Sequence, residues 1–236
     1  MCLIHVYDIK IAAVAVAGEA TRGVPNCQEK TMKAAIVSEP GSGPGYGELP
    51  IAVPSGDEYR IKLSASAVSH STKGHASGRH YSAGGQYPFI AGIDGVGKLE
   101  DGRRVYFALP RAPYGTLAEY TVIPSAFCVP VPEELDDLTA AAIANPGIAS
   151  WMALTERARL KPGETVLVNG ATGTSGRLAV QIARHLGAGK VIATGRNPAA
   201  LSTLETLGAD GVIRRNSCSA SISSSTFCGA SRRNAC

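Results

Sequence analysis

One glycine-rich stretch of the chain combines residue types that suit phosphate binding. It consists of Gly170, Ala171, Thr172, Gly173, Thr174, Ser175 and Gly176. An apolar run at residues 166–168 precedes it, and Leu178, Ile182 and Leu186 follow at helical spacing, which predicts a strand, a turn and a helix. Backbone N–H groups at a helix N-terminus lack intrahelical partners and the dipole is positive there. The stretch therefore predicts a dinucleotide phosphate site, with a plain surface turn as the alternative.

A second pair of residues, Gly195 and Arg196, lies about twenty residues beyond the last of these glycines, where a second strand ends. In this architecture an acidic residue at that position accepts from the ribose 2′-hydroxyl of NAD, whereas arginine accommodates the 2′-phosphate of NADP. Arg196 therefore favours NADP(H) as cofactor. The alternative is a solvated arginine near the start of the next helix.

The elements around these residues predict an α/β part that follows an all-β part. Short strands punctuated by Gly and Pro predict a barrel-like domain. They cover residues 32–37, 60–68, 96–99, 103–109, 116–123 and 127–131. Asp136 and Asp137 are candidate caps of a helix over residues 138–144, which Pro146 is expected to interrupt before a second helical run at residues 149–160.

The second half of the chain continues the strand and helix alternation. Asn197 is a candidate N-cap, with Pro198 in the first turn and Gly208 at the end of a leucine-bearing helix. Residues 211–213 then begin a third strand, which makes the order βαβαβ.

Four segments follow from this pattern. Residues 1–31 have no strong period and are expected to form a disordered extension. Residues 32–145 are expected to form the β-domain, and residues 146–213 a partial Rossmann domain that binds NADP. The serine-rich residues 214–236 are expected to be a disordered or aberrant tail.

Composition excludes several functional classes. The net charge of +4 arises from Arg214, Arg215, Arg232 and Arg233, beyond the last acidic residue, so a nucleic-acid partner is not expected. No apolar run approaches the roughly 20 residues of a membrane helix. The six cysteines form no C-x-x-C pair, which favours a reducing, cytoplasmic location. Residues 1–17 only superficially resemble a secretory signal, because Asp8 precedes their apolar run.

Further motifs carry a family resemblance. They lie at residues 32–35, 88–97, 114–120 and 166–176. Residues 32–213 thereby resemble the medium-chain dehydrogenase/reductase superfamily, in particular its zinc-independent, quinone-oxidoreductase-like branch. The resemblance implies a GroES-like β-barrel domain followed by a Rossmann domain, with NADPH and substrate in the cleft between them. It implies an oxidoreductase that transfers hydride from NADPH to a small molecule, a quinone or an activated alkene or carbonyl.

The same comparison argues against a metal. Zinc-dependent relatives carry Gly-His-Glu where this chain has Gly92-Ile93-Asp94, and an early cysteine where it has Val68-Ser69-His70. Catalytic zinc needs three protein ligands, which cannot be assembled here. His70, His75 and His80 are spaced five residues apart and share no helix face, so a polar active-site loop over residues 70–81 is expected.

The resemblance also implies roles for three further residues. Tyr81 is the candidate catalytic residue, as a donor to a substrate carbonyl; simple packing in its loop is the alternative. Asn145 is a candidate ligand of the nicotinamide carboxamide or an N-cap of the next helix. Ser150 is a candidate replacement for a threonine contact of the relatives.

The resemblance ends after the third Rossmann strand, so we expect a truncated or mis-joined chain, with residues 214–236 read from a shifted frame or an unspliced segment. In the strand order 3-2-1-4-5-6 the loss of strand 4 exposes the edge of the strand at residues 166–169. That edge is a predicted route to homo-oligomers or aggregation. The alternative function is therefore a catalytically inactive fragment with weak nucleotide binding or partner association.

Overall fold

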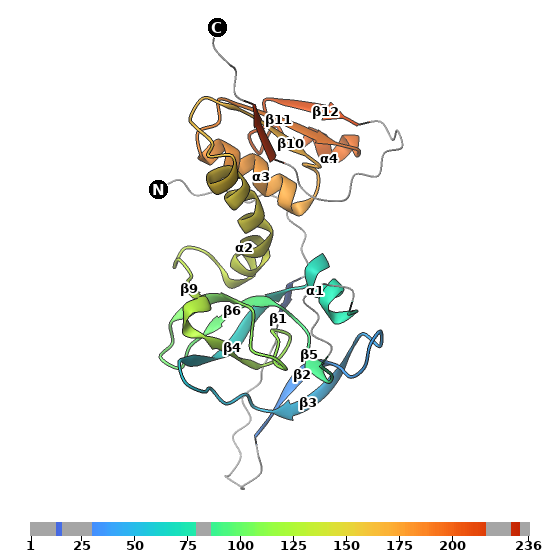
Figure 1. Cartoon of the computed structure of the whole chain (residues 1–236), viewed down its shortest axis with the longest axis vertical. Coiled ribbons are helices and arrows are strands. Elements are labelled where there is room, and N and C mark those ends of the chain that lie inside the picture. Colours follow the sequence, from blue (N-terminus) through green and yellow to red (C-terminus); the bar gives the residue numbers. More distant parts are fainter. Residues whose placement is uncertain (1–12, 16–29, 79–85, 216–227, 232–236) are drawn as a thin grey trace. The chain divides into compact units, whose positions relative to one another are not determined.

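The computed structural model describes residues 13–15, 30–78, 86–215 and 228–231, which fall into two compact units (Figure 1). The first, the β unit, ends at Ala144, and the second, the α/β unit, begins at Asn145. The predicted fold class, an α/β protein with an all-β part, is confirmed.

Two antiparallel sheets make up the β unit, and the larger one is curled. Its order is β1-β4-β6-β7-β9, and β8 pairs with the first half of β4. These strands are β1 (Ala13–Ala15), β4 (Glu58–Ala67), β6 (Asp94–Lys98), β7 (Arg104–Ala108), β8 (Tyr120–Pro124) and β9 (Cys128–Pro130). Alternate residues of β4, Ile61 and Leu63, are buried against Phe107 and Ile123, as the period of two in a half-buried strand requires.

The smaller sheet has the order β3-β2-β5, with β2 (Thr31–Val37), β3 (Pro44–Pro50) and β5 (Phe89–Ile90). An isolated bridge between Ala34 and Ala118, and a backbone hydrogen bond from Ala35 N to Leu117 O, join β2 to the segment that leads into β8. The predicted strands are present with ends shifted by a few residues. β3 and β5 were not predicted.

A short helix, α1 (His70–Ala76), occupies the start of the expected loop at residues 70–81, so that part of the prediction was wrong. Ser69 caps it: the Ser69 hydroxyl accepts from Thr72 N, and the Thr72 hydroxyl accepts from Ser69 N. This reciprocal pair is a capping box in which Thr72 takes the place usually held by Glu or Gln.

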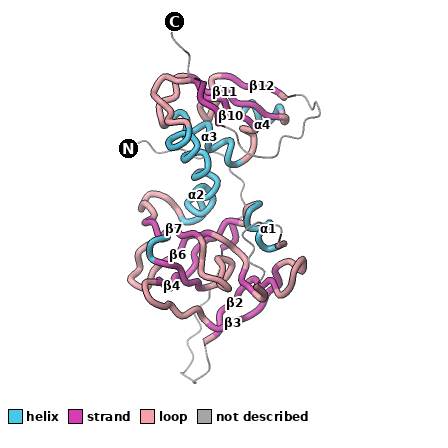
Figure 2. Tube along the Cα trace, viewed as in Figure 1, coloured by secondary structure: helices cyan, strands magenta, loops and turns pink. Residues whose placement is uncertain are grey.

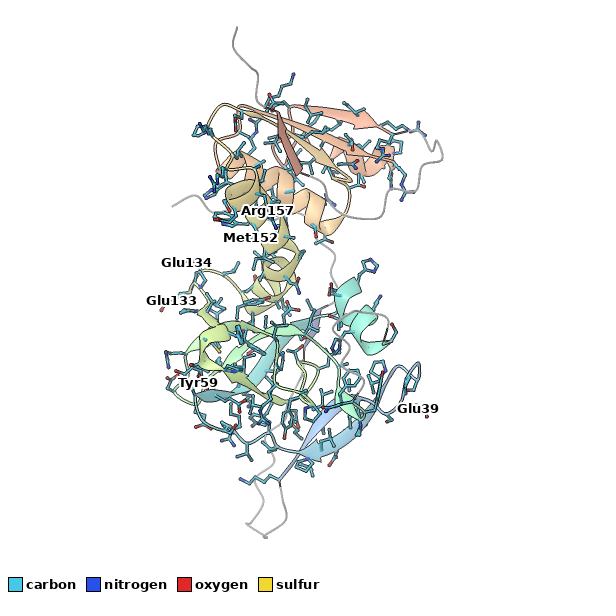
Figure 3. The ribbon with its side chains drawn as sticks, viewed as in Figure 1. Glu39, Tyr59, Glu133, Glu134, Met152 and Arg157 are labelled. Carbon is cyan, nitrogen blue, oxygen red and sulfur yellow. The ribbon has the colours of Figure 1, made fainter. Side chains whose placement is uncertain are left out.

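Helix α2 (Asp137–Met152) continues through Pro146, where an interruption was expected (Figure 2). Proline removes one backbone hydrogen bond and crowds the preceding turn. Buried residues on both sides of it, Ala141 and Ser150, anchor the helix nonetheless. The predicted cap is confirmed, because Asp136 Oδ1 accepts from Thr139 N at 2.9 Å and contacts with Thr139 lower the pKa of Asp136. A π-helical turn, η2 (Ala153–Arg157), follows; Met152 and Arg157 mark this junction in Figure 3.

The α/β unit is built on a four-stranded sheet of order β12-β11-β10-β13. Three strands are parallel: β10 (Thr165–Asn169), β11 (Lys190–Gly195) and β12 (Gly211–Arg214). α3 (Thr174–His185) packs on β10 and β11, and α4 (Pro198–Ser202) packs on β11 and β12.

The two faces of this sheet differ in exposure. Val166 and Val168 of β10 are fully buried, whereas Leu167 between them is 43% exposed. Ile213 on β12 is also exposed. Right-handed crossovers place α3 and α4 on the same face, which explains this alternation.

Two predictions about the ends of the chain need correction. β13 (Cys228–Ser231), within the expected tail, pairs antiparallel with β10 from Val168 to Thr165, so the predicted open edge of β10 is covered. β1, within the expected extension, pairs antiparallel with the end of β4. An unpaired strand edge offers backbone N–H and C=O groups to any extended segment. Because backbone groups make this pairing, the added strand does not need a regular alternation of apolar residues. No helix among the described residues is long and apolar enough to cross a membrane.

Candidate functional site

The glycine-rich stretch, residues 170–176, joins the end of β10 to the start of α3 as predicted; we call it the glycine turn. Gly170 has φ of 76°, in the left-handed region that favours glycine. Gly173 is the N-cap of α3, and within the described residues no side chain caps this helix end. The N–H groups of its first turn therefore face outward without a capping side chain, an arrangement that can accept an anion.

Gly176 allows α3 to approach β10 closely. A Cβ atom at this position would lie 2.6 Å from Ala171 Cα and would also meet Gly170 O. Both of these atoms belong to the backbone of the turn, so they cannot move aside as a side chain would. Glycine at position 176 thus holds the helix N-terminus against the strand end.

Contacts to the end of β11 fix the glycine turn in place. Ala171 is buried, and its N–H donates to Thr194 O at 2.8 Å. The Thr172 side chain packs on Gly195, where a Cβ atom would lie 2.6 Å from Thr172 Cγ2. Glycine at position 195 thus leaves room for the Thr172 side chain, and the ribose contact expected of Gly195 stays a prediction.

Arg196 follows Gly195 at the carboxyl end of β11 and is exposed. Asn197 caps α4 as predicted: its Oδ1 accepts from Ala199 N at 3.0 Å and Ala200 N at 3.4 Å. The cap orients the chain directly after Arg196, and the guanidinium remains available to a ligand.

A polar network that the sequence analysis missed lies beside the glycine turn. Asn169, the last residue of β10, accepts at Oδ1 from Thr194 Oγ1 at 2.8 Å and from Arg215 Nη1 at 3.0 Å. Arg215 lies within residues 214–236, the expected aberrant tail, and no local sequence pattern marks it as a site residue. Only the alignment of the three parallel strands brings these residues together.

The carboxyl edge of the parallel strands is cationic. Residues 165–176 and 191–204 contain no acidic residue, while Arg196, Arg214 and Arg215 lie at the ends of β11 and β12. Uncapped helix N–H groups and nearby guanidinium groups are the donors that a phosphate-bearing nucleotide requires, and a Cβ built on Gly170 would meet none of the described atoms within 4 Å. The arrangement can bind the pyrophosphate and a further phosphate of a dinucleotide.

Two of the remaining candidate residues, Asn145 and Ser150, lie in helix α2. Asn145 lies inside α2, so the expected N-cap role is wrong, and its side chain has an interaction partner. Ser150 is buried and its hydroxyl donates to Ser175 O at 3.3 Å, which ties α2 to the first turn of α3. Tyr81 and His80 lie outside the described residues.

In the β unit, Asp94 lies in the segment 92–94, where zinc-dependent relatives carry Gly-His-Glu, and its side chain forms an internal contact. Asp94 is fully buried and accepts from the Tyr106 hydroxyl at 3.0 Å. Burial, together with the neighbouring Asp94 carboxylate, raises the pKa of Tyr106 well above its usual range. His75 packs edge-on against Phe89 at a centroid distance of 5.3 Å. Within the described part of the chain, His, Cys, Asp and Glu side chains form no group of three able to hold a metal ion.

Comparisons with known proteins show which proteins this chain is similar to. The chain is 33% identical over 201 residues to an Emericella nidulans protein described as a probable NADPH-dependent quinone reductase, covering 72% of this chain and 56% of that protein. It is 28% identical to prostaglandin reductase-3 of Bos taurus, covering 72% of this chain and 46% of that protein.

Among solved structures, the chain is similar to a quinone oxidoreductase. The quinone oxidoreductase of Thermus thermophilus, also crystallised with NADPH, matches with a TM-score of 0.70 and 32% identity. The match covers 77% of this chain and 59% of that one. No protein-family model matches the chain. The chain thus spans about half to three fifths of the length of these proteins.

Proposed function

Because the chain belongs to the quinone-oxidoreductase-like branch of the medium-chain dehydrogenase/reductase superfamily, we propose that it binds NADP(H) at the glycine turn. We propose further that it serves zinc-independent hydride transfer to a quinone or an activated alkene or carbonyl. One observation carries this proposal: the uncapped N-terminus of α3 opens at the carboxyl edge of the parallel strands, with Arg196 at the end of the next strand.

In this proposal, the residues of the chain bind NADP(H) and orient it. First-turn N–H groups of α3 donate to the pyrophosphate, and Gly173 lets the phosphates approach the backbone. Arg196 pairs with the ribose 2′-phosphate, which distinguishes NADP(H) from NAD(H). NADP(H) supplies the transferred hydride when bound.

Replacing Arg196 by alanine tests the cofactor assignment. One charge-assisted contact contributes about 1.5–3 kcal/mol, so R196A is expected to weaken NADPH binding by roughly 10- to 100-fold in calorimetric titrations, while NADH affinity stays unchanged. Lys190→Ala is the matched control, because Lys190 is an exposed cation at the opposite, amino end of β11. Equal NADPH affinities of R196A and the parent would remove Arg196 from this role.

A second candidate function is nucleotide binding without turnover. The orientation of β13 favours it: next to β10, where the six-stranded order has parallel strand 4, β13 runs antiparallel. A parallel strand sends its following loop to the ligand edge, whereas an antiparallel strand sends that loop to the opposite edge. NADPH oxidation with 1,4-benzoquinone, measured alongside NADPH binding, separates the two candidates: binding without oxidation supports the second.

Tyr81 and Asn145 complete the proposed set of site residues. We propose that Tyr81 donates to the substrate carbonyl and that Asn145 bonds the nicotinamide carboxamide, as the family resemblance implies. In a chain that turns over, Tyr81→Phe is expected to lower kcat and leave NADPH affinity intact. An unchanged kcat assigns Tyr81 to packing.

We also propose a cytoplasmic location. It is supported by the absence of paired cysteine spacing in the sequence, and Cys128, whose side chain the structure describes, is a free thiol. Fractionation of cells that express the tagged chain checks it, and recovery from the medium would contradict it.

A further inference from the structure

Three arginines gather at the carboxyl ends of β11 and β12. Arg196 directly follows β11, Arg214 ends β12, and Arg215 directly follows it. The register pairs Gly195 with Arg214, and Arg215 N donates to Gly195 O at 2.8 Å. Arg215 is therefore held beside the end of β11, next to Arg196, although the two arginines are far apart in sequence.

The Arg215 side chain is directed toward the glycine turn. Its Nη1 donates to Asn169 Oδ1, and Asn169 is in turn held by Thr194 Oγ1. Asn169 immediately precedes Gly170, so this contact places the guanidinium at the same edge as the glycine turn. A guanidinium has five N–H donors, and this contact occupies one of them. The remaining donors can serve a ligand, since Arg215 is exposed.

Among the described residues, no carboxylate forms an ion pair with an arginine at this edge. The ion pairs that the described residues form involve Arg60, Arg103, Arg104, Arg111 and Arg184, and none of the three edge arginines. Neighbouring strands lie about 4.8 Å apart, so a phosphate at the end of β11 lies within reach of the end of β12. The site favours a ligand with a phosphate there.

We propose that Arg215, positioned by Asn169, is a second cationic contact to the ribose 2′-phosphate and acts with Arg196 to select NADP(H) over NAD(H). This inference rests on the proposed function, which assigns the pyrophosphate to the turn after β10 and the ribose to the end of β11. The strand order β12-β11-β10 then brings a 2′-phosphate toward β12. Each guanidinium group can donate two parallel N–H bonds to a phosphate, and two such groups bring two positive charges to it.

Calorimetric titration of the full chain with two small probes tests the inference. Adenosine 2′,5′-bisphosphate carries the 2′-phosphate and 5′-AMP lacks it. Arg215→Ala is expected to weaken binding of the bisphosphate about tenfold, equivalent to about 1.4 kcal/mol, and to change 5′-AMP affinity less than about twofold. Arg215→Lys is expected to give an intermediate loss, because it keeps the charge without the planar fork. Lys190→Ala, which removes one exposed cation at the amino edge, is the control for net charge.

The outcomes separate this inference from the function on which it rests. If R196A abolishes the preference for the bisphosphate while R215A leaves it intact, the Arg215 assignment fails and the cofactor assignment stands. If R215A weakens both probes equally, Arg215 contacts the adenine or the 5′-phosphate, and the selective role is overturned. If the parent binds neither probe nor NADPH, both proposals fail. Fluorescence of Trp151, the sole tryptophan, verifies that each variant is folded.

Discussion

Replacing Gly176 with alanine tests whether the glycine turn depends on the close approach of α3 to β10. The added Cβ would lie 2.6 Å from Ala171 Cα, about 0.8 Å short of the 3.4 Å at which ordinary contact begins. The contacted atoms are backbone, so the helix start or the turn must shift by a similar amount. Overpacking of this kind costs about 1–3 kcal/mol. The same shift displaces the phosphate-facing N–H groups and is expected to lower NADPH affinity at least tenfold.

Urea unfolding followed by Trp151 fluorescence measures the stability term. Trp151 belongs to the α/β unit and contacts His185 of α3 at a centroid distance of 6.0 Å, so its emission reports this unit. Gly211→Ala is the matched control, because a Cβ there would meet none of the described atoms within 4 Å. We expect Gly211→Ala to change the unfolding free energy by less than about 0.5 kcal/mol.

Gly173→Ala separates packing from ligand approach. A Cβ at this N-cap position would lie 3.8 Å from Gly170 O, so stability is expected to change little, while the methyl group faces the incoming phosphate. Full stability and full affinity of Gly176→Ala would refute the packing argument. Full affinity of Gly173→Ala would refute the placement of the phosphate.

Two further predictions concern stability. Hydrogen bonds from Val191 N–H and from the Arg184 side chain lower the pKa of Asp210 below its ordinary value of 3.8. These contacts therefore stabilise the folded state fully at pH values above 3.8, and the stabilisation is lost as the pH falls through the lowered pKa. Urea unfolding at several pH values should therefore show Asp210→Asn less stable than the parent at neutral pH, with the difference vanishing in acid; a difference independent of pH would contradict this. Tyr106→Phe removes a donor from the buried Asp94 and should destabilise the β unit by about 1–3 kcal/mol, measured by circular dichroism, and an unchanged midpoint would show that Asp94 is satisfied without it.

Much of the local structure follows from short-range sequence patterns. The glycine turn lies between a strand and a helix, as predicted, and Asn197 and Asp136 cap their helices. These features depend on a few neighbouring residues, since capping and turn geometry are satisfied within one or two helical turns.

Other elements depend on contacts that local patterns do not contain. The histidine spacing predicted a loop where α1 lies, and the capping box that starts this helix uses Thr72 rather than the Glu or Gln that usually marks such a box. Pro146 predicted a break in α2, but the burial that compensates for the lost hydrogen bond depends on contacts with other elements, which the local sequence does not contain. β5 has only two residues, too few to show a period.

By itself, the sequence determined the two-part organisation of the chain, the strand, turn and helix around the glycine turn, and the position of a cationic residue after β11. These are properties of periodicity, composition and spacing along the chain. Tertiary structure alone decided which segments meet: β13 covers the edge of β10, Thr172 packs on Gly195, and Asn169 holds Arg215 at the carboxyl edge. The physical reason is that strand pairing and side-chain networks join residues far apart in sequence, and their partners are defined only when the sheet has formed.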